Sequence, residues 1–217
     1  MLIDEVESSL HPRAQRRLIR DLANKCRELE LQVILTTHSP YVLDELPLEA
    51  RAYILQTHGR REIVYGVSPE FAMTKMDDVP HHECDLYVED ARAATMLTEI
   101  LAAHRSALVQ RCRTIPYGAA SVGQALGQMT AKGRFPTPSC VYLDGDQAAA
   151  TGCLKLPGDD APERVVFAAL QAVNWTGLKE RVGRDYSNVA DACRQAMTLG
   201  DHHEWVIACL QASATFE

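Results

Sequence analysis

The sequence predicts an α/β fold, in which a mostly parallel sheet is flanked by helices. Short apolar runs alternate with segments in which apolar residues recur every three or four positions, and this alternation is typical of strands followed by helices. Several of the apolar runs end directly in acidic residues. Because ligands bind outside the carboxyl ends of the strands in open α/β sheets, we expect a functional site where these acids gather.

The first 70 residues predict a small α/β segment of their own. An apolar run at 1–5 closes on two acids, a helix is expected from Pro12, and residues 32–37 have the composition of a buried strand. Residues 52–55 and 62–65 flank a polar turn and predict a β-hairpin.

A stretch of mixed charges with two methionines and one proline, residues 71–84, predicts a linker. Its last four residues, His-His-Glu-Cys, would suit a metal in isolation, but their spacing differs from that of known zinc sites, so we favour the linker. Residues 85–217 then predict the larger domain. Its expected elements are a strand from Asp85, a helix from Asp90 to His104, a strand at 113–115, a helix at 122–131, strands around Val141 and at 153–156, and helices from Asp160 onward.

The composition indicates a globular, cytoplasmic protein. Among 217 residues, no apolar run approaches the length of a membrane span, so we expect no membrane partner. The seven cysteines show no C-x-x-C spacing, which favours reduced thiols over a zinc site. The net charge of −7 argues against binding nucleic acid by simple electrostatics, although bound cations would reverse the local field.

Three carboxylates are the strongest candidates for a metal site. Asp144 and Asp146 close an apolar run, and Gly145 between them would leave room for an ion or phosphate. Glu89 ends another strand at its junction with a helix. Oxygen ligands of this kind suit Mg²⁺ or Mn²⁺. Taken alone, the Asp-Gly-Asp segment also fits a surface turn, and Glu89 fits an acid that favours the helix dipole.

This order of motifs resembles a known family. A strand ending in Glu89, a helix, a further α/β step and a strand ending in Asp144-Gly-Asp146 is similar to the Toprim domain, from about Asp85 to the end of the chain. The run Met1-Leu-Ile-Asp-Glu5 resembles a Walker B strand, Val6–Pro12 a D-loop, and Thr36–Glu45 the switch-histidine segment of ABC-type ATPases. An ABC-type ATPase followed by a Toprim domain is the layout of OLD-family (overcoming lysogenisation defect) nucleases.

The resemblance implies a metal-dependent DNA endonuclease that uses two Mg²⁺ or Mn²⁺ ions. Glu89, Asp144 and Asp146 would be catalytic and would bind metal. Asp90 is a further metal candidate, because Ala93 stands where Toprim sequences often carry a second acid, and Asp90 is also a plausible helix N-cap. Glu163 is the other metal candidate, and it fits equally an acid in the first turn of a helix.

Residues between and after the three carboxylates offer contacts for DNA. Ser121, beginning a helix, is a candidate phosphate contact, as are the basic residues Lys132, Arg134 and Lys155. A catalytic base is not assigned by spacing. Lys132, Lys155 and the His202-His203 pair are candidates, and the pair also suits a structural role at a helix start.

The ATPase-like segment is interpreted as a remnant. By resemblance, Asp4 would help to hold Mg²⁺, Glu5 would position water and His38 would contact the γ-phosphate. The chain contains no G-x-x-x-x-G-K-[ST], so we expect ATP binding only with a complete ATPase domain. The expected partners are DNA, a missing N-terminal ATPase domain and a second copy of the chain. The competing function is a non-catalytic assembly or regulatory module of an ABC-type ATPase complex.

Overall fold

The computed structural model describes residues 1–57, 60–74, 79–176, 178 and 186–214. It forms two compact units. The first comprises Met1–Asp85 with Leu101–Arg113, and the second comprises Leu86–Ile100 with Thr114–Glu217. Helices and parallel strands are both present, so the predicted α/β class is confirmed.

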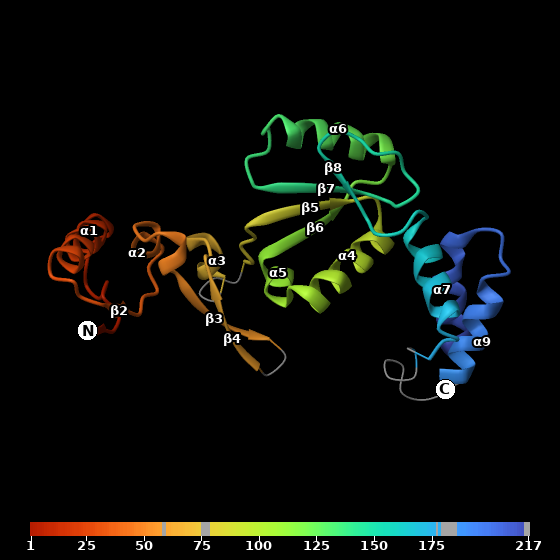
Figure 1. Cartoon of the computed structure of the whole chain (residues 1–217), viewed down its shortest axis with the longest axis horizontal. Helices are drawn as coiled ribbons and strands as arrows, with labels where there is room; N and C mark the ends of the chain where they lie inside the picture. Colours follow the sequence, from red (N-terminus) through yellow and green to blue (C-terminus); the bar gives the residue numbers. More distant parts are fainter. Residues whose placement is uncertain (58–59, 75–78, 177, 179–185, 215–217) are drawn as a thin grey trace. The chain divides into compact units, whose positions relative to one another are not determined.

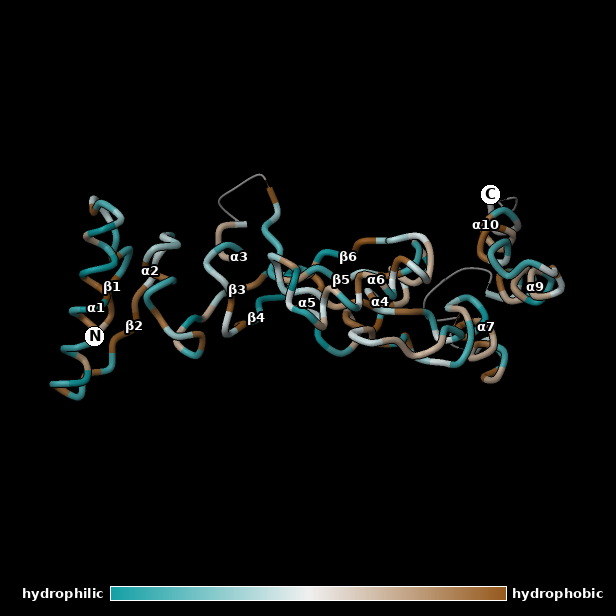
Figure 2. Tube along the Cα trace, turned by 90° about the horizontal axis from the view of Figure 1, so that it is seen from above, coloured by the Kyte–Doolittle hydropathy of each residue, from teal (hydrophilic) through white to brown (hydrophobic). Residues whose placement is uncertain are grey.

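The first unit begins with two short parallel strands and a long helix. Strand β1 (Leu2–Ile3) pairs with β2 (Ile34–Leu35), which is shorter than the predicted strand at 32–37 because β1 offers only two paired positions. Helix α1 (Pro12–Glu28) starts where expected: Pro12 occupies its first turn, and His11 caps it by accepting from the Arg13 amide. Figure 2 shows the β2 segment in hydrophobic colours beside the largely hydrophilic α1.

The remainder of the first unit is built around a hairpin. Helix α2 (Pro40–Asp44) and a 3₁₀ turn, η1 (Leu48–Ala50), precede β3 (Ala52–Thr57) and β4 (Arg60–Tyr65). The two strands are antiparallel, which confirms the predicted hairpin; its turn at 58–59 lies outside the described residues. Helix α3 (Pro69–Met73) occupies the start of the predicted linker, whose residues 75–78 are also outside. The hairpin and α3 share a small core of Leu55, Val64, Val67 and Phe71.

A four-stranded sheet carries the candidate site. Its order is β6-β5-β7-β8, and Figure 1 shows these strands side by side in that order. Strands β7 and β8 are parallel, with Leu143 opposite Lys155. Val88, Val141 and Leu143 are completely buried. The strand bounds are β5 Cys84–Val88, β6 Cys112–Pro116, β7 Ser139–Leu143 and β8 Cys153–Lys155.

Helices connect and cover these strands. Helix α4 (Ala91–His104) and α5 (Ser106–Arg111) link β5 to β6, and α6 (Ala120–Ala131) links β6 to β7. Asp90 is the predicted N-cap of α4, and its Oδ1 accepts from the amides of Arg92 and Ala93 at 2.8 and 2.9 Å.

Two glycines one turn apart bring α6 close to the sheet. A Cβ on Gly123 would overlap the Tyr117 ring, and a Cβ on Gly127 would overlap the Cys153 thiol and lie 2.8 Å from the Thr151 carbonyl oxygen. The connection before β8 turns through Gly152 at φ 75°, and its backbone meets Gly127. Helix α6 therefore packs backbone to backbone against this connection.

The last part of the second unit is helical, as predicted, within the described residues. Helix α7 (Pro162–Ala172), α9 (Tyr186–Ala196), the 3₁₀ turn η2 (His202–Glu204) and α10 (Trp205–Ala214) follow one another. Figure 1 shows α7 and α9 close together. Phe167 stands between Trp175 and Trp205, with ring centroids 6.3 and 5.3 Å away. Parts of the predicted helical region, 177, 179–185 and 215–217, lie outside the described residues.

Replacing Gly127 with alanine tests the close contact of α6. In a free helix this change is favourable by about 1 kcal/mol, but overpacking against a fixed backbone oxygen costs about 1–3 kcal/mol. We therefore expect Gly127→Ala to lower the free energy of unfolding, measured by urea denaturation. Gly200→Ala is the matched control, because no atom lies within 4 Å of the added Cβ. Equal stability of both variants would contradict the close packing.

Candidate functional site

Backbone hydrogen bonds place Glu89 at the carboxyl end of β5. The Tyr117 amide donates to the Val88 carbonyl and the Gly118 amide to the Glu89 carbonyl, both at 2.8 Å. The Ala120 amide, in the first turn of α6, donates to the Glu89 carboxylate. Glu89 is therefore held between the end of β5 and the start of α6, where helix amides favour a negative charge.

Asp144 follows the neighbouring strand β7 and is only 9% exposed. The Gln147 amide closes a turn onto the Asp144 carbonyl at 3.1 Å, and this turn leaves Asp146 on the surface. The Tyr117 hydroxyl donates to the Tyr142 carbonyl at 2.9 Å. Tyr117 thus links the segment after β6 to β7, at Tyr142, the second-last residue of β7.

Burial and neighbouring negative charges raise the pKa values of Asp144 and Glu89 at this edge of the sheet. Burial raises the pKa of Asp144 to about 7, and the negative charges of Glu89, Asp90, Asp146 and Glu163 act in the same direction. Burial also raises the pKa of Glu89, with Asp146 and Asp90 adding to it, while the Ala120 amide lowers it. The structure therefore brings the other four predicted metal ligands within electrostatic reach of Asp144.

Three of these carboxylates have a buried oxygen without a hydrogen-bond partner. Among the described residues, the buried side-chain oxygens or nitrogens in this state are Glu89 Oε2, Asp144 Oδ1 and Glu163 Oε1. An unsatisfied buried polar atom costs about 1–3 kcal/mol, and more when it is charged. A divalent cation would satisfy such oxygens and offset their repulsion, so the donor set fits Mg²⁺ or Mn²⁺.

Glu163 lies in the first turn of α7, with its side chain only 2% exposed. Its Oε1 is 3.8 Å from Arg92 Nε and 3.6 Å from His203 Nδ1. Together with His202 and His203 it forms a cluster whose three potential ligand atoms lie within 4.8 Å of one another. The sequence analysis missed this association, because helix spacing alone does not show that η2 packs against the start of α7.

The other predicted residues differ in their relation to the carboxylates. Asp90 uses one oxygen to cap α4, so only its other oxygen remains for a metal. Ser121, in the first turn of α6, and Lys155, at the end of β8, are exposed near the same edge of the sheet. Lys132 and Arg134 follow the other end of α6, which spans about 18 Å. The structure therefore does not bring them to the carboxylates.

Gly145 has a different role from the one expected. A Cβ at this position would overlap the Gly158 carbonyl oxygen and lie 2.7 Å from that of Asp160. The missing side chain therefore makes room for the loop after β8. This loop leads directly into α7, so the close approach helps to place Glu163 near Asp144.

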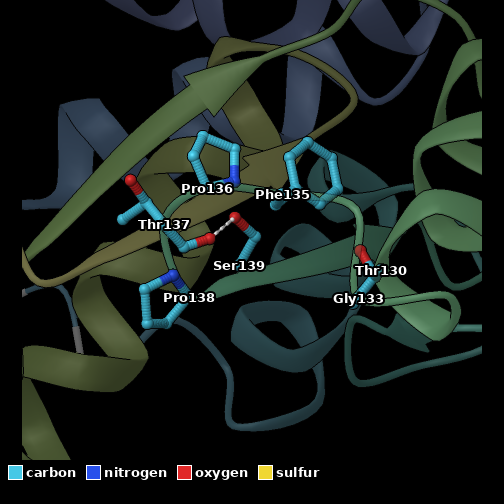
Figure 3. A pocket seen from close by; sticks show the side chains of 7 residues that line it. All are labelled: Thr130, Gly133, Phe135, Pro136, Thr137, Pro138 and Ser139. Atoms are coloured by element: carbon cyan, nitrogen blue, oxygen red, sulfur yellow. Dashed lines mark hydrogen bonds between the residues drawn. The ribbon is translucent and has the colours of Figure 1, made fainter.

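A hollow elsewhere in the second unit is not a chemical site. It is lined by Thr130, Gly133 and the segment from Phe135 to Ser139, which Figure 3 shows as a proline-rich turn. Its internal hydrogen bond runs from the Ser139 hydroxyl to the Thr137 carbonyl at 2.8 Å. Since none of the lining residues is titratable, the hollow offers neither a base nor a metal ligand.

In the first unit, the ATPase-like residues gather at the ends of β1 and β2. The Thr36 hydroxyl donates to Asp4, and the Glu5 amide donates to the Thr36 hydroxyl at 3.0 Å. Glu5 adopts a positive φ of 41°, and its carboxylate is 3.9 Å from His38 Nε2. The structure thus brings together Asp4, Glu5 and His38.

Glu7 is a further member of this group that the sequence analysis did not single out. Its carboxylate accepts from the Thr37 hydroxyl at 2.6 Å and from the His38 amide at 2.5 Å. Although burial acts to raise the pKa of Glu7, these hydrogen bonds lower it below its usual value. Glu7 therefore fixes the backbone that carries His38.

Comparisons with known proteins bear on the first unit. The family model described as "AAA domain, putative AbiEii toxin, Type IV TA system" matches residues 1–44, the segment that holds Asp4, Glu5 and His38. No curated protein matches the chain significantly. The N-terminal segment is therefore similar to AAA/ABC-type ATPases, as expected from its motifs. Within the described part of the chain, no helix has the length and apolar character required to cross a bilayer.

The raised pKa of Asp144 predicts a pH-dependent stability in the absence of metal. The ordinary value is 3.8 and the folded value about 7, so the folded state holds this proton more tightly and loses stability as pH rises between them. Asn mimics the neutral acid. In EDTA, we expect Asp144→Asn to raise the free energy of unfolding at pH 8 by roughly 1–3 kcal/mol, with little gain at pH 4.5.

The matched control for this measurement is Asp159→Asn, which changes an exposed acid on the loop after β8. It should leave the difference between the two pH values unchanged. Parallel pH–stability curves for the wild type and Asp144→Asn would contradict the assignment of a buried, mutually repelling carboxylate.

Proposed function

We propose that this protein is a metal-dependent DNA endonuclease of the OLD type, in which the second unit is a Toprim domain. The observation that carries the proposal is the pair of unpartnered buried oxygens on Glu89 and Asp144. Glu89 and Asp144 follow adjacent strands of the sheet, where α/β enzymes place their ligands. The order of strands, helices and acids is the second support.

In this proposal Glu89, Asp144 and Asp146 hold Mg²⁺ or Mn²⁺. The bound ions would neutralise charge on the scissile phosphate and make a water easier to deprotonate. Glu89 is oriented by the Ala120 amide and Asp144 by the turn closed through Gln147. Exposed Asp146 is free to face the solvent side, from which DNA would approach.

The protein groups that would position DNA are few, because the chain is acidic. Ser121 at the start of α6 and Lys155 at the end of β8 are the proposed phosphate contacts. Ions bound to the carboxylates would reverse the negative local field. DNA binding should therefore depend on divalent metal more strongly than it does in proteins with a basic surface.

A non-catalytic assembly role is the second candidate, and a feature of the first unit favours it. Leu2 and Ile34, paired across β1 and β2, are 80% and 59% exposed. Such an uncovered apolar pair suits contact with a partner, and the ATPase-like segment that contains it would be one half of that contact. In this role ATP would be bound only by a complete ATPase domain.

Cleavage of supercoiled plasmid with Mg²⁺ or Mn²⁺ distinguishes the two functions. Glu89→Gln and Asp144→Asn should each lower the rate by on the order of 100-fold or more, since each removes a charged ligand. Asp159→Asn should cleave as the wild type does. EDTA should abolish cleavage.

Two results would decide against the nuclease. Cleavage that persists in both ligand variants would place the activity elsewhere or in a contaminant. No cleavage by the wild type with any divalent ion would leave the assembly role as the better account.

A further inference from the structure

Glu163 is buried in an environment that does not match its charge. Its side chain is 2% exposed, yet Oε1 has no hydrogen-bond partner among the described residues. The basic nitrogens paired with it, Arg92 Nε and His203 Nδ1, lie at 3.8 and 3.6 Å, which is too far for a hydrogen bond. A bound cation would supply the partner that this buried oxygen lacks.

The two histidines beside it are held in place by their backbone. Asp201 Oδ1 accepts from the His203 amide at 3.0 Å and starts the 3₁₀ turn η2. Trp205, the residue that follows η2, is buried in the helical core, and its indole N–H donates to the Leu199 carbonyl at 3.1 Å. The imidazoles remain adaptable: their ring centroids are 4.0 Å apart, and the His203 side chain is 63% exposed.

We propose that Glu163, His202 and His203 form a binding site for a transition-metal ion of the Zn²⁺ or Co²⁺ type. Two imidazole nitrogens and one carboxylate oxygen are a donor set that such ions prefer, whereas Mg²⁺ prefers oxygen alone. The three potential ligand atoms lie within 4.8 Å of one another. Bonds of about 2.1 Å require separations of about 3.4 Å in a tetrahedral site, and rotation of the exposed His203 and the half-buried His202 supplies that adjustment.

This site goes beyond the proposed nuclease function, because it has different ligands and a different ion preference from Glu89, Asp144 and Asp146. It also changes the expected role of Glu163, which the sequence analysis assigned to a second Mg²⁺ or Mn²⁺. An ion bound there would join α7, which carries Phe167 of the helical core, to η2, which directly precedes Trp205 of the same core. Metal binding should therefore stabilise the helical part of the second unit.

The simplest competing account is an ion pair. Glu163 would then be balanced only by Arg92 and by a protonated His203. The two accounts differ in what the imidazoles do: in the metal site both histidines contribute a nitrogen, whereas the ion pair involves His203 alone. Comparing His202→Ala with His203→Ala is therefore informative.

The test is Co²⁺ binding to the metal-stripped full chain, followed by visible absorption. We expect one Co²⁺ per chain with ligand-field bands, displaced by Zn²⁺ but not by millimolar Mg²⁺. His202→Ala and His203→Ala should each weaken binding by about 10-fold or more, as loss of a ligand does. His104→Ala, which alters an exposed histidine at the end of α4, is the matched control.

A second pair of measurements keeps this test separate from the nuclease proposal. Asp144→Asn combined with Asp146→Asn should keep the Co²⁺ bands even if plasmid cleavage is lost. Zn²⁺ should raise the melting temperature of the wild type but not that of the double variant His202→Ala/His203→Ala. Absence of Co²⁺ bands, bands that survive in this double variant, or bands lost in the aspartate variant would each overturn the inference.

Discussion

The repulsion among buried carboxylates at the end of β5 and β7 is the constraint on which the rest of the second unit depends. Glu89 and Asp144 lie in a region of low dielectric, and each has a buried oxygen that no group of the described residues satisfies. Such an arrangement costs free energy, so the surrounding contacts must hold it. Tyr117 ties β6 to β7, and Gly127 and Gly145 let α6 and the loop before α7 approach closely. Such an unfavourable arrangement of buried charges is typical of a functional site.

Much of this site follows from sequence, because it depends on local order. An apolar strand ending in an acid and followed by a capped helix predicts where Glu89 and Asp144 lie, and Asp90 is the expected cap. The association of Glu163 with His202 and His203 depends on helix packing between distant segments, which no local pattern encodes. Proximity in sequence can also mislead. Lys132 is near Asp144 in sequence, but it follows the end of α6, whereas Asp144 follows the end of β7 at the opposite edge of the sheet.

The two units have different grounds for their interpretation. In the first, the motifs, the family match at 1–44 and the contacts among Asp4, Glu5, Thr36 and His38 agree on an ATPase-like segment. In the second, the interpretation rests on the geometry and electrostatics of the carboxylates. Asp85, at the start of β5, contrasts with these carboxylates. This buried acid is paired with Arg113 at 2.9 and 3.0 Å and has a structural role. A buried acid with a partner stabilises a fold, whereas one without a partner suggests a ligand.

The central claim is that the unpartnered oxygens of Glu89 and Asp144 are metal ligands. The most direct measurement is an anomalous difference map from crystals of the protein soaked in Mn²⁺. The account predicts a peak bonded to both carboxylates at about 2–2.3 Å. A map without a peak at this position, in which both oxygens accept hydrogen bonds from water or from a neighbouring lysine, would contradict it.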